Sequence, residues 1–103
     1  MSGQAFGVIG LEVMGRNVAQ NVERNGFPVA VYNRTWEKTE DFMNGPAKGK
    51  RFKAAKTEAE FVSLLERPRR ILVMVKAGKP VDLVIDALQP HLEEGDIVID
   101  GGN

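Results

Sequence analysis

Short apolar runs alternate with amphipathic stretches along this chain. Phe6–Ile9 and Val29–Tyr32 are apolar without alternation, which is typical of strands that are covered on both faces. Ile71–Val75 is the strongest strand signal, and Ile97–Ile99 predicts a last strand. The stretch around Arg51–Ala54 is weakly patterned, and we expect at most a short edge strand there.

The segments between these strands carry helix signals. Met14, Val18 and Val22 recur every four residues and predict one buried stripe on the first helix. Thr57 and Glu60 have the spacing of a capping box, so a helix is expected to begin there. The predicted helices cover Met14–Asn25, Trp36–Met43 after a cap at Thr35, Glu58–Leu65, and the segment that begins at Lys79-Pro80.

This alternation of strands and helices predicts a single α/β domain over residues 1–103. Because crossovers between parallel strands are right-handed, we expect a Rossmann-like, doubly wound parallel sheet with the strand order 3-2-1-4-5. Ligands bind such sheets at the carboxyl ends of the strands, beside the point where the strand order reverses. Candidate motifs fall at that edge at Gly10–Gly15, Asn33–Thr35, Lys76–Gly78 and Asp100–Asn103.

The segment from Gly10 to Gly15 follows the first strand and opens the first helix. Gly10 would permit a sharp turn, and Gly15 would let the helix pack closely on the strand. The free N–H groups at the helix start would then face a pyrophosphate. Glu12 replaces the middle glycine of the dinucleotide-binding pattern, and Arg16-Asn17 excludes a P-loop, which needs lysine and serine or threonine there. An ordinary strand–turn–helix junction is the alternative.

The end of the second strand indicates which dinucleotide would bind. A domain that binds NAD normally places a carboxylate there for the ribose 2′-hydroxyl, but this chain has Asn33, Arg34 and Thr35. A guanidinium can pair with a 2′-phosphate through two charge-assisted hydrogen bonds, and the amide and hydroxyl groups add donors. The residues therefore predict NADP over NAD. The alternative is that Thr35 only caps a helix and Arg34 is a solvated surface charge.

Two further strand ends carry small residues. Val75, Lys76 and Ala77 are expected to lie against adenine and ribose, although a plain strand-to-helix turn is the alternative. Asp100-Gly-Gly-Asn103 would bring backbone N–H groups close to a ligand, and Asn103 offers both a donor and an acceptor. A glycine-rich turn without a ligand is the alternative for that segment.

The composition narrows the function classes. Fourteen basic and fourteen acidic residues cancel, which gives no electrostatic footprint for nucleic acid or an anionic membrane. The chain has no cysteine and one histidine, which excludes disulfides and argues against a transition-metal site. Its N-terminal segment lacks the features of a signal peptide, and no apolar run approaches membrane-spanning length. A cytoplasmic protein is expected.

Together these motifs resemble the N-terminal coenzyme domain of the decarboxylating 6-phosphogluconate dehydrogenase family. The resemblance covers nearly the whole chain. It is carried by Gly10-Leu-x-Val-Met-Gly15-Arg-Asn17, Glu23-Arg-Asn-Gly26, Val31-Tyr-Asn-Arg-Thr35, Arg69-Arg-Ile-Leu-Val-Met-Val-Lys-Ala-Gly78 and Asp100-Gly-Gly-Asn103.

The resemblance implies an NADP-dependent oxidoreductase of the pentose phosphate pathway and of gluconate utilization. This family oxidises 6-phosphogluconate and decarboxylates it to ribulose 5-phosphate. The implied coenzyme contacts are Gly10, Leu11, Glu12, Val13, Met14 and Gly15 at the pyrophosphate, Asn33, Arg34 and Thr35 at the 2′-phosphate, and Val75, Lys76 and Ala77 on the adenosine side. Asn103 would lie near the nicotinamide and the sugar phosphate substrate.

The chain departs from the family in two ways. The family is much longer and has its catalytic residues and a helical domain beyond this segment, so we expect a truncated domain that does not turn over substrate. The family also has alanine where this chain has Glu12, whose charge would oppose a pyrophosphate while it suits the helix dipole and can satisfy free N–H groups. We further expect self-association through an exposed edge at Ile97–Ile99.

Three rival interpretations stay open at this point. One is a non-catalytic nucleotide-sensing module with the same fold, which would often keep an acidic residue where Asn33 stands. Another is an engineered Rossmann module in which Glu12 has removed binding and only the fold remains. The third is a related β-hydroxyacid dehydrogenase, although Asn33-Arg-Thr35 with Asp100-Gly-Gly-Asn103 favours the phosphogluconate enzyme.

Overall fold

The computed structural model describes residues 3–76 and 78–101. In these ranges the chain forms a five-stranded sheet with the order β3-β2-β1-β4-β5, and every neighbouring pair is parallel. This confirms the predicted fold class and strand order. The strands are β1 (Phe6–Ile9), β2 (Val29–Tyr32), β3 (Phe52–Ala54), β4 (Arg70–Val73) and β5 (Ile97–Asp100). The helices are α1 (Val13–Arg24), α2 (Trp36–Asn44), α3 (Glu58–Ser63) and α4 (Lys79–Leu88), and a 3₁₀ turn (Gln89–His91) follows α4.

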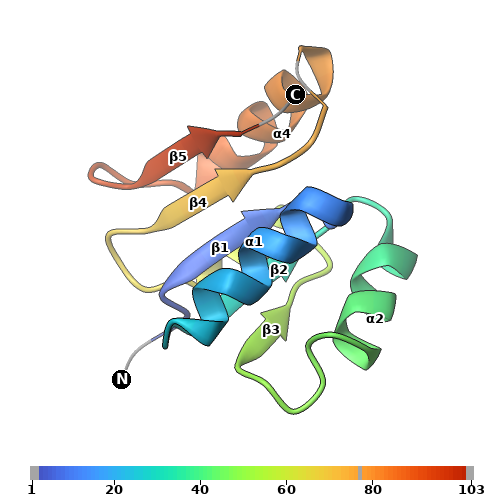
Figure 1. Ribbon diagram of the computed structural model, residues 1–103. Coiled ribbons are helices and arrows are strands. Elements are labelled where there is room, and N and C mark those ends of the chain that lie inside the picture. The colour runs from blue at the N-terminus through green and yellow to red at the C-terminus, as the bar shows by residue number, and fades with distance from the viewer. Residues whose placement is uncertain (1–2, 77, 102–103) are drawn as a thin grey trace.

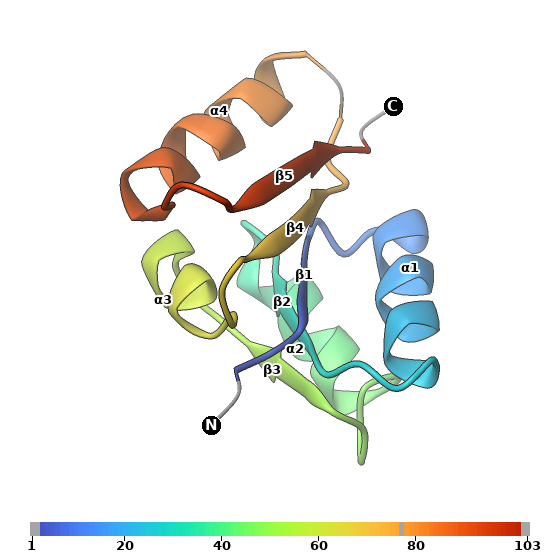
Figure 2. The same cartoon turned by 90° about the vertical axis from the view of Figure 1, so that its left-hand side faces the viewer.

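The helices cover both faces of the sheet (Figures 1 and 2), with α1 on one side and α3 and α4 on the other. Successive residues of β2 contribute to opposite faces, since Val29 and Val31 pack in one apolar cluster and Ala30 and Tyr32 in the other. Phe42 of α2 belongs to the first cluster, where its ring meets Phe52 edge-on at 5.0 Å. The central strands are therefore buried on both faces, as their continuous apolar runs predict.

The face that α1 buries differs from the predicted stripe. Gly15, Ala19 and Glu23 are its buried residues, whereas Met14 is 53% exposed. The reason is the close approach of the helix to the end of β1, because a Cβ added to Gly15 would lie 1.8 Å from the Gly10 carbonyl oxygen. A small residue must face the sheet at Gly15, and Met14 beside it stays exposed, whereas Val22 of the predicted stripe does pack against the core cluster on this face.

Several element boundaries differ from the sequence-based expectation. The third helix ends at Ser63, where the N–H groups of Leu64 and Leu65 donate to carbonyls three residues earlier and tighten the last turn. The central strand covers Arg70–Val73 rather than Ile71–Val75, so Val75 lies in the loop beyond the strand. The other elements agree with the predicted ranges to within one residue, apart from α4, for which only the start was predicted.

The two predicted N-caps have different outcomes. Thr57 accepts a hydrogen bond from the Glu60 N–H at 3.1 Å, which confirms that cap, while the Glu60 carboxylate accepts from the Lys56 N–H. Thr35 stands at the N-cap position of α2, but its hydroxyl makes no cap hydrogen bond. The prediction of a side-chain cap at Thr35 is therefore wrong, because the backbone carbonyl of Thr35, not its hydroxyl, accepts from the Lys38 N–H.

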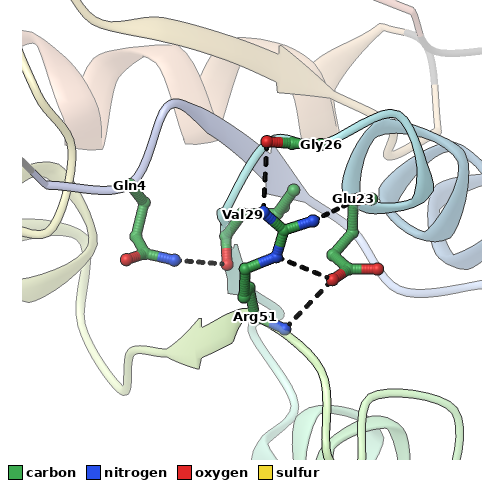
Figure 3. A network of polar contacts seen from close by, with 5 residues as sticks. All are labelled: Gln4, Glu23, Gly26, Val29 and Arg51. Carbon is green, nitrogen blue, oxygen red and sulfur yellow. Dashed lines mark hydrogen bonds and ion pairs between the residues drawn. The ribbon is translucent and has the colours of Figure 1, made fainter.

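Ion pairs join the elements at the amino ends of the strands, and two of them make further hydrogen bonds to the backbone. The Glu23 carboxylate accepts hydrogen bonds from the backbone N–H and the Nε of Arg51, while the rest of the Arg51 guanidinium donates to the carbonyls of Glu23 and Gly26 (Figure 3). Nearby, the Gln4 amide donates to the Val29 carbonyl at 3.2 Å. The Arg51 bonds connect the end of α1 to the starts of β2 and β3, and the Gln4 bond connects the segment before β1 to β2.

The second pair, Arg69 and Asp96, connects the starts of β4 and β5. Their side chains are only 9% and 2% exposed, and the distance between Arg69 Nη1 and Asp96 Oδ2 is 2.9 Å. Asp96 also accepts from the backbone N–H groups of Arg69 and Glu93, and Arg69 Nε donates to the Val62 carbonyl. Hydrogen bonds thus compensate for the burial of both charges.

The far edge of the sheet is less covered. Ile97 and Ile99 of β5 are 51% and 46% exposed, and Leu83 of α4 is 51% exposed. Across residues 3–76 and 78–101, no helix is both long and apolar enough to cross a membrane.

Candidate functional site

A cavity of about 680 Å³ lies at the carboxyl ends of β1, β2 and β4. It is the place that the reversal of strand order predicts, between the first strand and the central strand β4. The residues that line it come from the glycine turn, the loop after β2, the loop after β4 and the first turns of α4. They are Gly10, Glu12, Asn33, Arg34, Thr35, Met74, Val75, Lys76, Lys79, Pro80, Leu83 and Val84.

A smaller cavity of about 260 Å³ adjoins the first on the side of α1. It is lined by Glu12, Val13, Met14, Gly15, Met74, Val75, Lys76 and Gly101. Glu12 and the Met74–Lys76 loop line both cavities. An extended ligand that occupied both cavities would therefore pass beside Glu12.

The glycine turn has the geometry that its sequence predicts. Gly10 adopts φ of 101°, which a residue with a side chain rarely adopts, and a Cβ there would lie 2.6 Å from the Met74 carbonyl oxygen. Its N–H donates to the Tyr32 carbonyl at 2.9 Å, which extends the β1–β2 ladder by one step. The turn is thus held between the ends of β2 and β4.

Asn33 connects the glycine turn to the loop after β2. Its Oδ1 accepts from the Leu11 N–H at 2.8 Å, and its Nδ2 donates to the Thr35 carbonyl at 3.1 Å. The sequence predicted an amide donor for a phosphate at this position, but did not predict these contacts within the protein. Asn33, directly after β2, thus fixes the distance between the glycine turn and the loop after β2.

Arg34 and Thr35 are both exposed and line the larger cavity. Within the described residues, no hydrogen bond or ion pair holds the Arg34 guanidinium. The Thr35 hydroxyl is not used as a helix cap. The cation and the hydroxyl are thus both available to an anionic ligand in this cavity.

Tyr32, the residue before Asn33, packs on the face of the sheet that α3 and α4 cover. Its hydroxyl donates to Glu58 Oε2 at 3.0 Å. Burial, together with the hydrogen bond and the negative charge of Glu58, raises the pKa of the Tyr32 phenol to about 12. The phenol therefore stays neutral at physiological pH and anchors the end of β2 to α3.

Glu12 departs from the role that its sequence position suggested. It occupies the N-cap position of α1, but its side chain makes no cap hydrogen bond. Its carboxylate instead pairs with Lys38 of α2, whose Nζ lies 3.1 Å from each carboxylate oxygen. The prediction that Glu12 satisfies free N–H groups is therefore wrong, because the lysine ammonium is a stronger partner within reach.

The predicted site residues do not all reach a cavity. Leu11 is only 1% exposed and packs in the core cluster on the α1 face of the sheet, and its N–H is bonded to Asn33. The coenzyme contact at Leu11 stays a prediction, because the side chain of Leu11 is buried and its N–H is already bonded. The predicted contacts at Ala77 and Asn103 lie outside the described residues. All other predicted residues line one or both cavities.

Sequence reasoning missed several residues at this edge. Lys38 lies in the first turn of α2, and its place beside Glu12 depends on how the start of α2 is positioned relative to the start of α1. Lys79, Pro80, Leu83 and Val84 line the cavity from α4. The proline at the start of α4 was a usable signal, because a helix that begins at a strand's carboxyl end presents its first turns to this edge.

A third cavity, of about 620 Å³, lies at the amino ends of the strands. It is lined by Ala5, Phe6, Asn21, Val22, Asn25, Phe27, Glu66 and Arg70, none of which was predicted to bind a ligand. Among residues 3–76 and 78–101, no group of three or more histidine, cysteine, aspartate or glutamate side chains is placed to hold a metal ion.

Comparison with known proteins decides the family. The sequence profile described as the NAD binding domain of 6-phosphogluconate dehydrogenase matches residues 5–103. The chain belongs to the 6-phosphogluconate dehydrogenase family. It corresponds to the N-terminal coenzyme-binding domain of that family, as the motifs predicted.

Relatives support this placement. The decarboxylating 6-phosphogluconate dehydrogenase of Synechocystis sp. is 66% identical over 103 residues, which are 100% of this chain and 21% of that protein. The Bacillus subtilis protein, named as NADP(+)-dependent, is 56% identical over 100% of this chain and 22% of its own length. The chain thus spans about a fifth of the length of the curated relatives it matches.

A solved structure agrees with the fold. The 6-phosphogluconate dehydrogenase of Plasmodium falciparum superimposes with a TM-score of 0.84 at 41% identity, over 95% of this chain and 21% of that one. That protein was solved in its apo form and in complexes with its cofactor NADP+ and its substrate 6-phosphogluconate.

Proposed function

We propose that this domain binds NADP at the carboxyl edge of its sheet. The observation that carries the proposal is the placement of Arg34 and Thr35 in the same cavity as the glycine turn. A guanidinium without a protein partner in the described residues matches a 2′-phosphate, whereas NAD would leave this charge unused. The family membership and the NADP-dependent relative support the same coenzyme.

In the complete protein, the proposed role is to present NADP for the oxidative decarboxylation of 6-phosphogluconate to ribulose 5-phosphate. The relatives named for this reaction are about five times longer than the chain. We therefore assign no catalytic residue here and expect the isolated chain to bind coenzyme without turnover. A contact of Asn103 with the nicotinamide and the substrate belongs to the same proposal.

Glu12 sets the strength of this binding. A carboxylate about 5 Å from a pyrophosphate oxygen, at an effective dielectric of about 20, would oppose binding by roughly 3 kcal/mol for one pair of unit charges. The Lys38 ammonium beside Glu12 cancels part of this repulsion. Since Glu12 lines both cavities, it lies on the proposed path of the pyrophosphate. We expect coenzyme binding that is weakened but not abolished.

The decisive experiment is a calorimetric titration of the chain with NADP and with NAD. Arg34→Ala should weaken NADP binding at least about tenfold, because it removes a charge-assisted pair, and should change NAD binding less than about twofold. Arg24→Ala removes another exposed arginine, at the far end of α1, and serves as the matched control. Equal losses for both coenzymes, or no loss for NADP, would contradict the proposal.

The same titration distinguishes the proposed function from the rival interpretation in which Glu12 has removed binding. A Rossmann module in which Glu12 has removed binding would give no heat with either coenzyme in the parent, and binding would appear in Glu12→Ala. A cytoplasmic location stays a prediction from the sequence.

Self-association through the β5 edge also stays a proposal. The exposure of Ile97 and Ile99 supports it, because an apolar strand edge can pair with a second chain. Light scattering over a range of concentrations should show a mass that rises above 11.3 kDa. A monomer at every concentration would rule it out.

A further inference from the structure

The backbone ladder between β1 and β2 ends at Gly10, whose N–H donates to the Tyr32 carbonyl. One residue later, the Leu11 N–H donates to the side chain of Asn33 rather than to another backbone carbonyl. The Asn33 side chain thus continues the ladder at the point where the two chains separate. From this position it also donates to the Thr35 carbonyl.

These two bonds require the two ends of a carboxamide. The acceptor end holds the glycine turn through Leu11, and the donor end holds the loop that carries Arg34 and Thr35. An aspartate would keep the acceptor but would place a carboxylate oxygen against the Thr35 carbonyl. A leucine of similar size would leave the Leu11 N–H and the Thr35 carbonyl without this partner.

We propose that Asn33 is a positioning residue that couples the glycine turn to the Arg34–Thr35 loop, so that its loss weakens both coenzymes and not NADP alone. The inference rests on the proposed function, because the two loops are the proposed sites of the pyrophosphate and the 2′-phosphate. It differs from a role as a 2′-phosphate ligand, which would affect only a coenzyme that carries this group. Asn33 still lines the cavity, but its amide is already bonded within the protein.

Binding measurements distinguish the two roles. Asn33→Ala should weaken NADP and NAD by similar factors, on the order of fivefold or more, since one hydrogen bond contributes about 1 kcal/mol, which corresponds to about fivefold in affinity. Arg34→Ala is the matched comparison, because it should weaken NADP alone. A loss in Asn33→Ala that is confined to NADP would overturn the positioning role.

A second measurement needs no coenzyme. In the parent chain, the Leu11 amide should exchange slowly with solvent, since Asn33 accepts its hydrogen bond. Exchange should be about tenfold faster in Asn33→Ala and Asn33→Leu, but should stay slow in Asn33→Asp, which keeps the acceptor. Arg34→Ala should leave it unchanged. Unchanged Leu11 exchange in Asn33→Ala would overturn the proposal.

The two measurements separate the possible failures. If the parent chain binds neither coenzyme, the proposed function fails, while Leu11 exchange still reports whether Asn33 holds the turn. If NADP binds but Asn33→Ala affects neither affinity nor exchange, the coupling role fails and the proposed function stands. Circular dichroism of each variant establishes that the sheet has formed.

Discussion

The amino ends and the carboxyl ends of the strands differ in how their charged side chains are paired. At the amino ends of the strands, the Arg69–Asp96 pair is buried and each partner makes further hydrogen bonds to the backbone. At the carboxyl ends, the Lys38–Glu12 pair is 47% and 70% exposed, and within the described residues neither side chain has a further hydrogen bond. The first pair is buried within the fold, whereas the second is open to solvent and lies beside both cavities.

This difference follows from what each edge must do. A buried pair with every hydrogen bond satisfied fixes the entry of two strands, but it leaves no charge for a ligand. An exposed pair contributes little to stability, typically less than about 1 kcal/mol, because water screens it. The carboxyl edge therefore keeps charged groups such as Arg34 available, at little benefit to the stability of the fold.

The largest expected effect is on the free energy of unfolding, from a substitution at the amino ends of the strands. Asp96→Ala should lower the free energy of unfolding by about 3–5 kcal/mol, because it leaves the Arg69 guanidinium buried without its carboxylate. Urea denaturation followed by circular dichroism measures this change. Glu93→Ala is the control, since Glu93 pairs with Arg67 at the surface and its loss should change stability by less than about 1 kcal/mol. Equal effects of the two variants would remove the contrast between the edges.

The next largest effect should be a loss of stability at low pH, from the carboxylates at the amino ends of the strands. The backbone N–H of Arg51 lowers the pKa of Glu23 more than burial raises it. Burial opposes ionisation of Asp96, but hydrogen bonds from the Arg69 and Glu93 backbone and from the Arg69 side chain outweigh it and lower its pKa. Both carboxylates therefore bind protons less readily in the folded chain than in the unfolded one.

The sign of the pH dependence follows from these two shifts. Their contribution to stability is complete above the ordinary pKa values of 4.5 and 3.8, and it is lost as the pH falls through the lower folded values. Urea midpoints should therefore decrease between about pH 5 and pH 3. The decrease should be smaller in Glu23→Gln. A parent chain whose midpoint does not change over this range would show that these carboxylates are not held as described.

The smallest expected effect on stability is at the carboxyl edge, where the change should appear in binding. Glu12→Ala should strengthen NADP binding about tenfold, less than the full repulsion would give, because Lys38 already offsets part of the charge. Lys38→Ala should weaken binding, since it leaves Glu12 uncompensated. Both variants should change the free energy of unfolding by less than about 1 kcal/mol. Calorimetry and urea denaturation of the two variants and the double variant measure both effects.

An opposite result would be informative. If Glu12→Ala left NADP affinity unchanged, Glu12 would not lie on the path of the coenzyme. If Lys38→Ala destabilised the chain as much as Asp96→Ala, the exposed pair would be part of the fold rather than of the site.

Much of this protein was determined by its sequence alone. Continuous apolar runs gave the strands, because a strand covered on both faces has no polar side, and short crossovers left few possible strand orders. The glycine turn and Arg34 were assigned to one edge on the same grounds, since parallel strands end together there. These features depend on local composition and chain connectivity, which are readable without coordinates.

Only the tertiary structure decided which groups are bonded to one another. The buried face of α1 depends on how closely Gly15 approaches Gly10, so the predicted stripe failed at Met14, which is exposed, although Val22 does pack against the core. The partners of Glu12 and Asn33 are 26 and 22 residues away in the sequence, and their distances are fixed by how helices and loops pack. Side-chain pairing over such separations depends on three-dimensional geometry, which no local pattern of residues encodes.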